Sequence, residues 1–188
     1  MMIPGVELRF ISTAVGRGVC TIRPIPRGTI VWVLDPLDRR ISDTEYASLP
    51  PLLRAEVEMY GYIDANGDRI LCWDLGRHMN HSCAPTGRTV GGLFEIATRD
   101  IPAGAELTTE YATLNIALPS ACACGSAACR GAVSPTARDL DDYRRAWDRE
   151  AAAAVALASS VEQPLASLLE IHPTLDDLRR VLRPSQSR

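Results

Sequence analysis

Three closely spaced cysteines constrain the fold of this chain more than any other feature. They are Cys122, Cys124 and Cys129, in the pattern C-x-C-x4-C. In a chain without a secretory leader, clustered cysteines more often bind metal than form disulfides. Structural zinc takes four tetrahedral thiolate or imidazole ligands, so one more ligand is needed. Cys83, in a polar loop, is the best candidate, with His81 and His78 as the alternatives. Such a site would join two distant loops and contribute folding energy directly.

The other two cysteines, Cys20 and Cys72, lie in apolar stretches, which is typical of small core residues. No apolar run follows a basic start at the N-terminus, so we expect no secretory signal. The longest weakly apolar run, over 151–158, is too short to span a bilayer. We therefore expect a cytoplasmic protein without a membrane span, and a secreted disulfide protein is disfavoured.

Length and composition are those of a folded domain with an appendage. The chain has 188 residues, of which 46% are hydrophobic and 23% charged. Its net charge of -3 gives no clustered positive excess, so we expect no direct nucleic-acid partner. The sequence contains no lysine, and all its basic residues are arginine. GC-rich coding is the favoured explanation. Avoidance of self-modification is the alternative, and it matters only if the protein modifies lysines.

The first 120 residues are typical of a mainly β fold built from short strands broken by Gly and Pro. We predict strands over 6–11, 18–22, 29–34, 60–64, 69–73, 93–97 and 106–111. Ser42 and Glu45 form a capping-box pattern at the start of a helical stretch. Asn66-Gly67 is typical of a hairpin turn. Apolar residues at three- and four-residue steps predict a helix from Leu140, with shorter helices near Leu165 and from Thr174.

Two further motifs accompany the cysteines. Arg77-His-Met-Asn80-His81-Ser-Cys83-Ala-Pro85 combines an uncommon polar cluster with a cysteine, and Ala105-Glu-Leu-Thr-Thr-Glu-Tyr111 follows downstream. The ordinary interpretation of Asn80 is a turn residue bonded to its own backbone. For His81 it is a satisfied loop histidine, and for Tyr111 a core tyrosine at a strand end.

In this order, the motifs resemble those of the SET-domain protein-lysine methyltransferases. The resemblance is carried by Gly16-Arg17-Gly18, by residues 77–85 and 104–111, and by the post-SET cysteine pattern. It implies a SET-type fold of several small β-sheets with a knot-like threading, an exception to unthreaded topology. In that fold the Asn-His and Glu-Leu-Thr…Tyr segments lie side by side. The resemblance implies a SET domain over 1–119, a zinc-binding post-SET segment over 120–133 and a C-terminal helical extension over 134–188.

The resemblance also implies S-adenosylmethionine as methyl donor and a structural zinc ion. Arg17 and Gly18 would contact the methionine moiety through the backbone. Asn80 and His81 would hold the cofactor, His81 through its main chain near the adenine. Tyr111 would be the catalytic residue and would also contact the cofactor. The zinc ligands would be Cys83, Cys122, Cys124 and Cys129.

The implied reaction transfers a methyl group to the ε-amine of a lysine in a protein or peptide substrate, a histone or another protein. The cofactor carries the activated group, so the enzyme aligns a neutral amine with it and excludes water. Free lysine is almost fully protonated at neutral pH, so a proton must leave first. No general base is needed if bulk water takes that proton.

Some positions depart from the family pattern. Leu34 stands where many members have a tyrosine, and we expect Tyr60 or Tyr62 to supply a second aromatic wall instead. Thr109 stands where a Phe or Tyr often influences the number of methyl groups added, so the product state remains open. The alternative function is therefore a non-catalytic, zinc-stapled SET-like binding module. We expect the C-terminal helices to cap the β core. They could instead cover the substrate channel or form a homodimer face, and the oligomeric state remains open.

Overall fold

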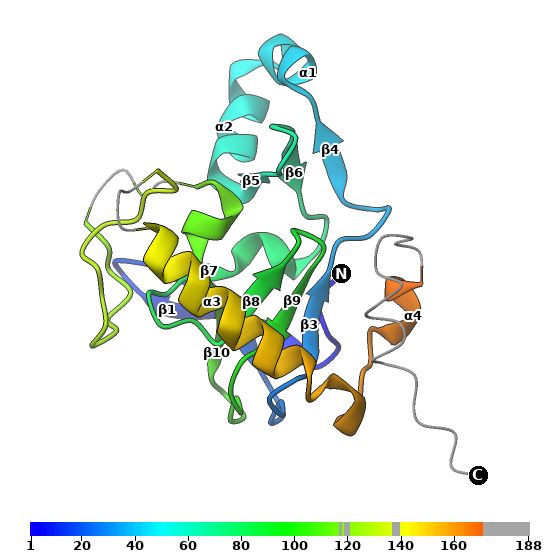
Figure 1. Ribbon diagram of the computed structural model, residues 1–188. Coiled ribbons are helices and arrows are strands. Elements are labelled where there is room, and N and C mark those ends of the chain that lie inside the picture. Colours follow the sequence, from blue (N-terminus) through cyan, green and yellow to red (C-terminus); the bar gives the residue numbers. More distant parts are fainter. Residues whose placement is uncertain (117, 119–120, 137–139, 171–188) are drawn as a thin grey trace.

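The computed structural model describes residues 1–116, 118, 121–136 and 140–170, and most of its elements are short strands (Figure 1). The paired strands form three small sheets, of four, three and three strands. Helices follow in the C-terminal part of the chain. The predicted fold class, mainly β with several small sheets and a C-terminal helical region, is confirmed. The knot-like threading stays a prediction.

The four-stranded sheet has the order β1-β2-β10-β7 and brings distant motifs together. Its strands are β1 (Val6–Ser12), β2 (Gly16–Thr21), β7 (Asn80–His81) and β10 (Glu106–Thr109). β10 runs antiparallel to β2 and parallel to β7, with Thr108 opposite Asn80 and Thr109 opposite His81. The two motifs predicted to lie side by side are thus adjacent strands.

The second sheet has the order β3-β9-β8 and is the most buried part of the fold. Its strands are β3 (Ile30–Val33), β9 (Phe94–Ala97) and β8 (Gly87–Val90). Every residue of β3 and β9 is buried, as expected for short apolar strands covered on both faces. Helix α3 (Leu140–Val155) contacts β8 and β9 and buries Trp147, Ala151 and Ala154 (Figure 1).

The C-terminal helices share the core of the sheets. After α3 come the 3-10 turn η3 (Ala158–Ser160) and α4 (Ala166–Leu169), whose Leu169 is buried in the same cluster as β3 and β9. Gln163 fastens this segment: its Oε1 accepts from Ile30 N at 2.9 Å and its Nε2 donates to Gly28 O at 2.7 Å. These helices therefore cap the β core, as expected. The helix predicted from Thr174 lies outside the described residues.

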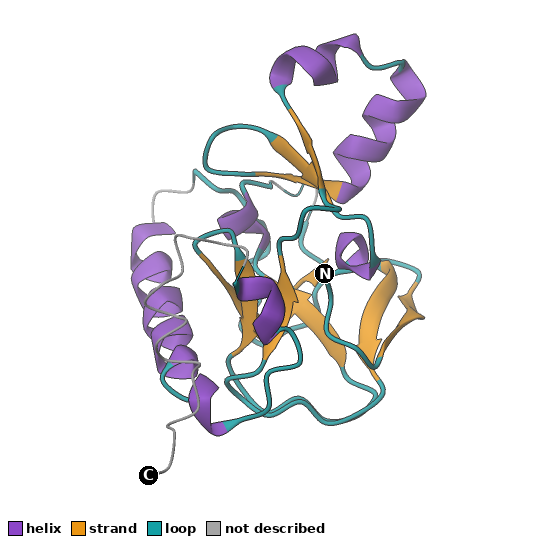
Figure 2. Cartoon of the chain, turned by 90° about the vertical axis from the view of Figure 1, so that its right-hand side faces the viewer, coloured by secondary structure: helices purple, strands orange, loops and turns teal. Residues whose placement is uncertain are grey.

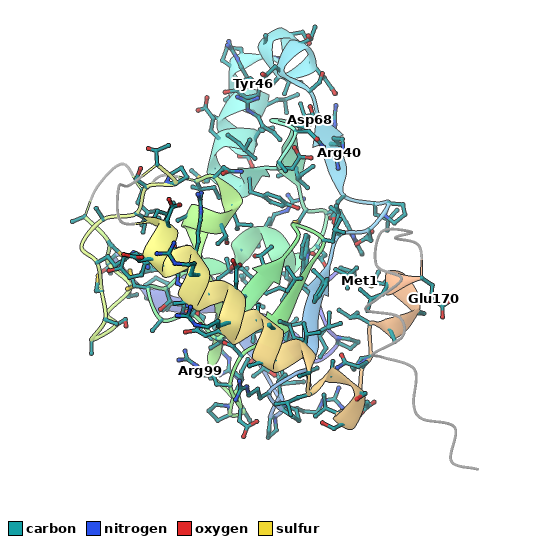
Figure 3. The ribbon with its side chains drawn as sticks, viewed as in Figure 1. Met1, Arg40, Tyr46, Asp68, Arg99 and Glu170 are labelled. Carbon is teal, nitrogen blue, oxygen red and sulfur yellow. The ribbon has the colours of Figure 1, made fainter. Side chains whose placement is uncertain are left out.

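The third sheet and two helices form a lobe that projects from the body (Figures 1 and 2). They are β4 (Arg39–Ile41), β6 (Arg69–Leu71), β5 (Gly61–Ile63), α1 (Asp43–Ser48) and α2 (Pro51–Tyr60). Ser42 caps α1 by accepting from Glu45 N at 3.2 Å, while the Glu45 carboxylate pairs with Arg39 at 2.6 Å. Arg40 pairs with Asp64 and, at 3.4 Å, with Asp68; Figure 3 labels Arg40, Asp68 and Tyr46 in this lobe.

The hairpin predicted around Asn66-Gly67 is confirmed, because β5 and β6 pair antiparallel on either side of this turn. Asp64 Oδ1 stabilises the turn by accepting from Asn66 N at 2.8 Å and from Asp68 N at 3.0 Å. One prediction of local geometry needs correction. Tyr111 is not at the end of a strand. It begins the 3-10 turn η2 (Tyr111–Leu114), because Glu110 caps that turn by accepting from Ala112 N.

A second 3-10 turn, η1 (Leu75–His78), leads into β7. Cys20 and Cys72 are buried and free, as predicted for core residues. Among the described helices none is both long and apolar enough to cross a membrane.

Candidate functional site

Hydrogen bonds join the Gly16-Arg17-Gly18 motif to the Asn-His motif across the first sheet. Asn80 Nδ2 donates to Arg17 O at 3.0 Å and to Glu106 Oε1 at 2.7 Å. A Cβ at Gly18 would lie 2.6 Å from Asn80 Nδ2, so only glycine leaves room for this amide. The sequence prediction missed Glu106. The available sequence signal for Glu106 was an acidic residue at the start of a predicted strand. In the structure it is the first residue of β10 and pairs in register with Cys20 of β2.

A cavity that we call the loop cavity lies beside β7. It is lined by Ala14, Val15, Asn80, His81, Tyr111, Leu118 and residues 121–124. β7 is the outermost described strand of its sheet, so its outer backbone groups can bind a ligand. Arg17 and Gly18 are not among the described residues that line the cavity, and Arg17 reaches it only through Asn80.

A second cavity, the aromatic cavity, lies on the other side of Tyr111. Its apolar and aromatic lining includes Trp32, Met59, Tyr60, Tyr62, Met79, Tyr111, Leu114 and Ile116. Both tyrosines suggested as a second aromatic wall therefore line it. Trp32 and Tyr62 meet edge to face, with ring centroids 6.2 Å apart. The polar part of the lining includes Thr89, Glu95 and Thr109.

Tyr111 lines both cavities. Its hydroxyl donates to Met79 O at 3.1 Å, and its backbone N–H donates to His81 Nδ1 at 3.3 Å. Burial, followed by the negative charge of Glu106, raises the pKa of Tyr111 to about 12. The hydroxyl therefore keeps its proton at neutral pH, and the side chain acts as a hydrogen-bond donor in the wall between the cavities.

Three of the four predicted zinc ligands, Cys83, Cys122 and Cys124, come together with His81 at the rim of the loop cavity, and the fourth, Cys129, lies outside this group. Cys83 Sγ lies 3.9 Å from Cys122 Sγ, close to the separation of about 3.8 Å expected for two thiolates on one tetrahedral zinc ion. The thiol of the exposed Cys129 donates to Cys122 O at 3.7 Å, and Arg130 N donates to Cys83 Sγ at 3.3 Å. All of these cysteines are free. The donor set therefore fits a zinc ion.

The electrostatic environment of the thiols differs within the cluster. Burial tends to raise the pKa of Cys124, but hydrogen bonds from the Cys83 and Ser126 backbone outweigh it and lower the pKa to about 7. Burial raises the pKa of Cys122 to about 12. Cys124 is thus the more readily deprotonated of the two, and metal binding would release the proton of the other.

His81 is the other potential ligand, because its ring nitrogen lies with the Sγ atoms of Cys83, Cys122 and Cys124 in a group whose members are within 4.8 Å of one another. The hydrogen bonds argue for a different role. Nδ1 accepts the Tyr111 N–H, so in the neutral ring the proton is on Nε2, which faces Cys83 Sγ at 3.3 Å. Burial lowers the pKa of His81, so the 3.6 Å approach of Glu110 to Nδ1 is not an ion pair.

Glu95 is the residue that sequence reasoning missed entirely. It lies in β9 between Phe94 and Ile96, and only 3% of its surface is exposed. Burial raises the pKa of Glu95 to about 7, although hydrogen bonds from Thr89 and Thr109 oppose this rise. A single acidic residue in the apolar strand Phe-Glu-Ile-Ala was the available signal.

Comparison with known proteins identifies related sequences. The family model described as "SET domain" matches residues 16–112. Histone-lysine N-methyltransferase ASHH2 of Arabidopsis thaliana is 30% identical over 143 residues, which are 65% of this chain and 8% of that protein. The chain thus spans less than a tenth of the length of this relative. The crystal structure of the Plasmodium falciparum "putative histone methyltransferase PFL0690c" has a TM-score of 0.43 and 19% identity, covering 58% of this chain and 95% of that one.

Proposed function

The chain belongs to the SET-domain family, and on that premise we propose that it is an S-adenosylmethionine-dependent protein-lysine N-methyltransferase. The observation that carries the proposal is the position of Tyr111 between the loop cavity and the aromatic cavity. A methyl transferase needs a donor site and an acceptor site that meet at one point, because the reacting atoms must approach in line. One cavity on each side of a single tyrosine provides this arrangement.

The loop cavity is the proposed donor site. Asn80 and His81 would hold S-adenosylmethionine, with the outer backbone groups of β7 available to the adenine. Arg17 and Gly18 would act indirectly, through Asn80. The carbonyl oxygen of Arg17 accepts from the Asn80 side-chain amide and holds it in place. When bound, this cofactor supplies an activated methyl group on a sulfonium. Donor groups for it are present, since the cavity combines a side-chain amide and strand-edge backbone with apolar Ala14, Val15 and Leu118.

The aromatic cavity is the proposed acceptor site for a lysine side chain. Its aromatic and methionine walls fit a four-carbon stem, and they exclude water from the reacting amine. The Tyr111 hydroxyl, fixed by the Met79 carbonyl, would orient the amine at the inner end. The substrate is proposed to be a lysine in a protein or peptide, a histone or another protein; ASHH2 is named as a histone-lysine methyltransferase.

We further propose that zinc binds Cys83, Cys122, Cys124 and Cys129, with His81 donating an N–H···S bond to Cys83. The tautomer fixed by Tyr111 N–H favours this assignment over direct ligation by His81. Residues 121–124 both contain two of these ligands and line the loop cavity. The metal would therefore hold one wall of the donor site in place.

The test uses the full chain with S-adenosylmethionine, core histones and a cell protein extract, and detects methyllysine by mass spectrometry. We expect methylation by the wild type and at least a roughly hundredfold loss in Tyr111→Phe, which removes only the hydroxyl. Tyr143→Phe is the matched control, because Tyr143 lies on α3 outside both cavities.

Calorimetric titration with S-adenosylmethionine separates the alternatives. Cofactor binding without turnover on any acceptor would favour the zinc-stapled binding module. A folded, zinc-loaded chain that does not bind the cofactor would refute the enzymatic proposal.

A further inference from the structure

Unsatisfied polar atoms gather around the aromatic cavity. Three residues that line it each carry a buried side-chain atom without a hydrogen-bond partner among the described residues: Trp32 Nε1, Tyr62 Oη and Glu95 Oε1. All three side chains belong to residues that are more than nine-tenths buried. Buried polar atoms are normally satisfied, so a cavity with three orphans indicates a polar ligand that completes them.

We propose that Glu95 binds the ammonium group of the substrate lysine inside the aromatic cavity and accepts its proton before methyl transfer. This inference rests on the proposed function, which it deepens by naming the proton acceptor. It also replaces the expectation that bulk water alone takes the proton.

The carboxylate of Glu95 is held in a defined orientation by the two neighbouring strands. Its Oε2 accepts from Thr89 Oγ1 at 2.8 Å and from Thr109 Oγ1 at 3.0 Å, while Oε1 remains free. Gly87 leaves space for the free oxygen: a Cβ there would lie 3.0 Å from Oε1 and 2.9 Å from Cγ. One oxygen is therefore anchored by two hydroxyls, and the other is buried beside Gly87 without a hydrogen-bond partner among the described residues.

No cation is hydrogen-bonded to Glu95 among the described residues. The buried Arg88 on β8 lowers the pKa of Glu95 by its charge, but its Nε donates to Glu150 on α3 at 2.8 Å and its Nη1 has no hydrogen-bond partner among the described residues. Glu110, which follows β10, acts in the opposite direction. Burial dominates both and raises the pKa to about 7. Thr89 and Thr109 contribute hydroxyls only, so an ammonium group would be the first cation to hydrogen-bond this carboxylate.

The proton transfer is balanced within the pair. One N–H bond of the lysine ammonium breaks and one O–H bond forms on Glu95, so that ammonium and carboxylate become a neutral amine and a neutral carboxyl group. The nitrogen lone pair is then free to form the N–C bond. Burial favours the neutral pair, because it lowers the pKa of an amine and raises that of a carboxyl group. Tyr111 cannot replace Glu95 in this step, because its pKa of about 12 keeps its hydroxyl protonated.

The kinetic test compares pH profiles of kcat/KM for wild type and Glu95→Gln, with the histone or extract protein that the wild type methylates. Wild type can use the abundant ammonium form, so its rate should level off above about pH 7. Glu95→Gln can use only amine that is already neutral. Its rate should therefore rise about tenfold per pH unit between about pH 7 and 9, with a loss of about a hundredfold at about pH 8.

Two further variants exclude a merely structural role. Thr109→Val keeps the carboxylate but removes one hydrogen bond that lowers its pKa, so the plateau of kcat/KM should begin at higher pH. Glu56→Gln makes the same charge change at an exposed position of α2 and should leave the profile unchanged.

A binding test reads the same site without turnover. Binding of n-butylammonium is measured by tryptophan fluorescence at about pH 8.5. It should bind the wild type at least about tenfold more tightly than it binds Glu95→Gln. n-Butyltrimethylammonium, which has no N–H donor, should bind the wild type more weakly than n-butylammonium. Equal affinities in wild type and Glu95→Gln, together with parallel pH profiles, would overturn the role of Glu95 and leave the methyltransferase proposal standing. Butylammonium binding that depends on Glu95, without any methylation, would support Glu95 as an ammonium-binding group and count against the methyltransferase proposal.

Discussion

Glu95 should make the stability of the ligand-free protein depend on pH, and Glu95→Gln should remove that dependence. The pKa of this carboxyl rises from 4.5 to about 7 on folding, because the folded chain buries it completely. The folded protein therefore binds this proton more tightly than the unfolded chain does, so the stability that depends on this group is present below pH 4.5. It is lost as the pH rises from 4.5 to about 7. At about 1.4 kcal/mol per pKa unit, the wild type should lose about 3 kcal/mol relative to a neutral isostere.

The assay is urea denaturation of both proteins between about pH 5 and 8.5. The difference between the free energies of unfolding of the variant and the wild type is compared with its value at low pH, where Glu95 is protonated in both states. Relative to that value, the variant should be more stable by under about 1 kcal/mol at about pH 5 and by about 3 kcal/mol at about pH 8.5. The side-chain amide that replaces the carboxyl adds a constant offset, so the slope of the difference carries the information. Glu56→Gln, at an exposed site, should give a flat difference. A flat difference for Glu95→Gln, or a variant that becomes relatively less stable as the pH rises, would refute the reasoning.

Two other predictions concern the proposed zinc site and the hydrogen bonds of Gln163. The purified chain should contain one zinc ion, measured by atomic absorption. Cys124→Ser should lose the zinc, while Cys20→Ser should keep it. If Cys129→Ser keeps the zinc and His81→Ala loses it, His81 and not Cys129 is the fourth ligand. Gln163→Ala should lower the free energy of unfolding by about 2 kcal/mol in urea denaturation, because it leaves the buried Ile30 N–H and the Gly28 carbonyl without partners. Glu162→Ala, at the exposed neighbour, should change little, and equal effects of the two variants would contradict this account.

The sequence predicted the pieces of the site better than their connections. Short strands, the cysteine cluster and the C-terminal cap followed from local pattern, because Gly, Pro and apolar periodicity act locally. The adjacency of Asn80 and Thr108 came from the family resemblance, since a parallel pair between distant segments has no local signal. Glu95 and Gln163 were missed because their roles depend on partners from other strands and helices. The residues next to them in the chain do not specify those partners.

The edge position of β7 has a consequence for the order in which the protein folds. This strand is only two residues long, and its one sheet neighbour among the described strands is β10, which follows it by more than twenty residues. A strand this short gains nothing until β10 has paired with β2, so the loop closures between them must come first. The wall over 121–124 can close only later still. Synthesis from the N-terminus would therefore give a chain whose β1–β2 hairpin forms early, while the loop cavity remains open until residues 121–124 have been synthesised.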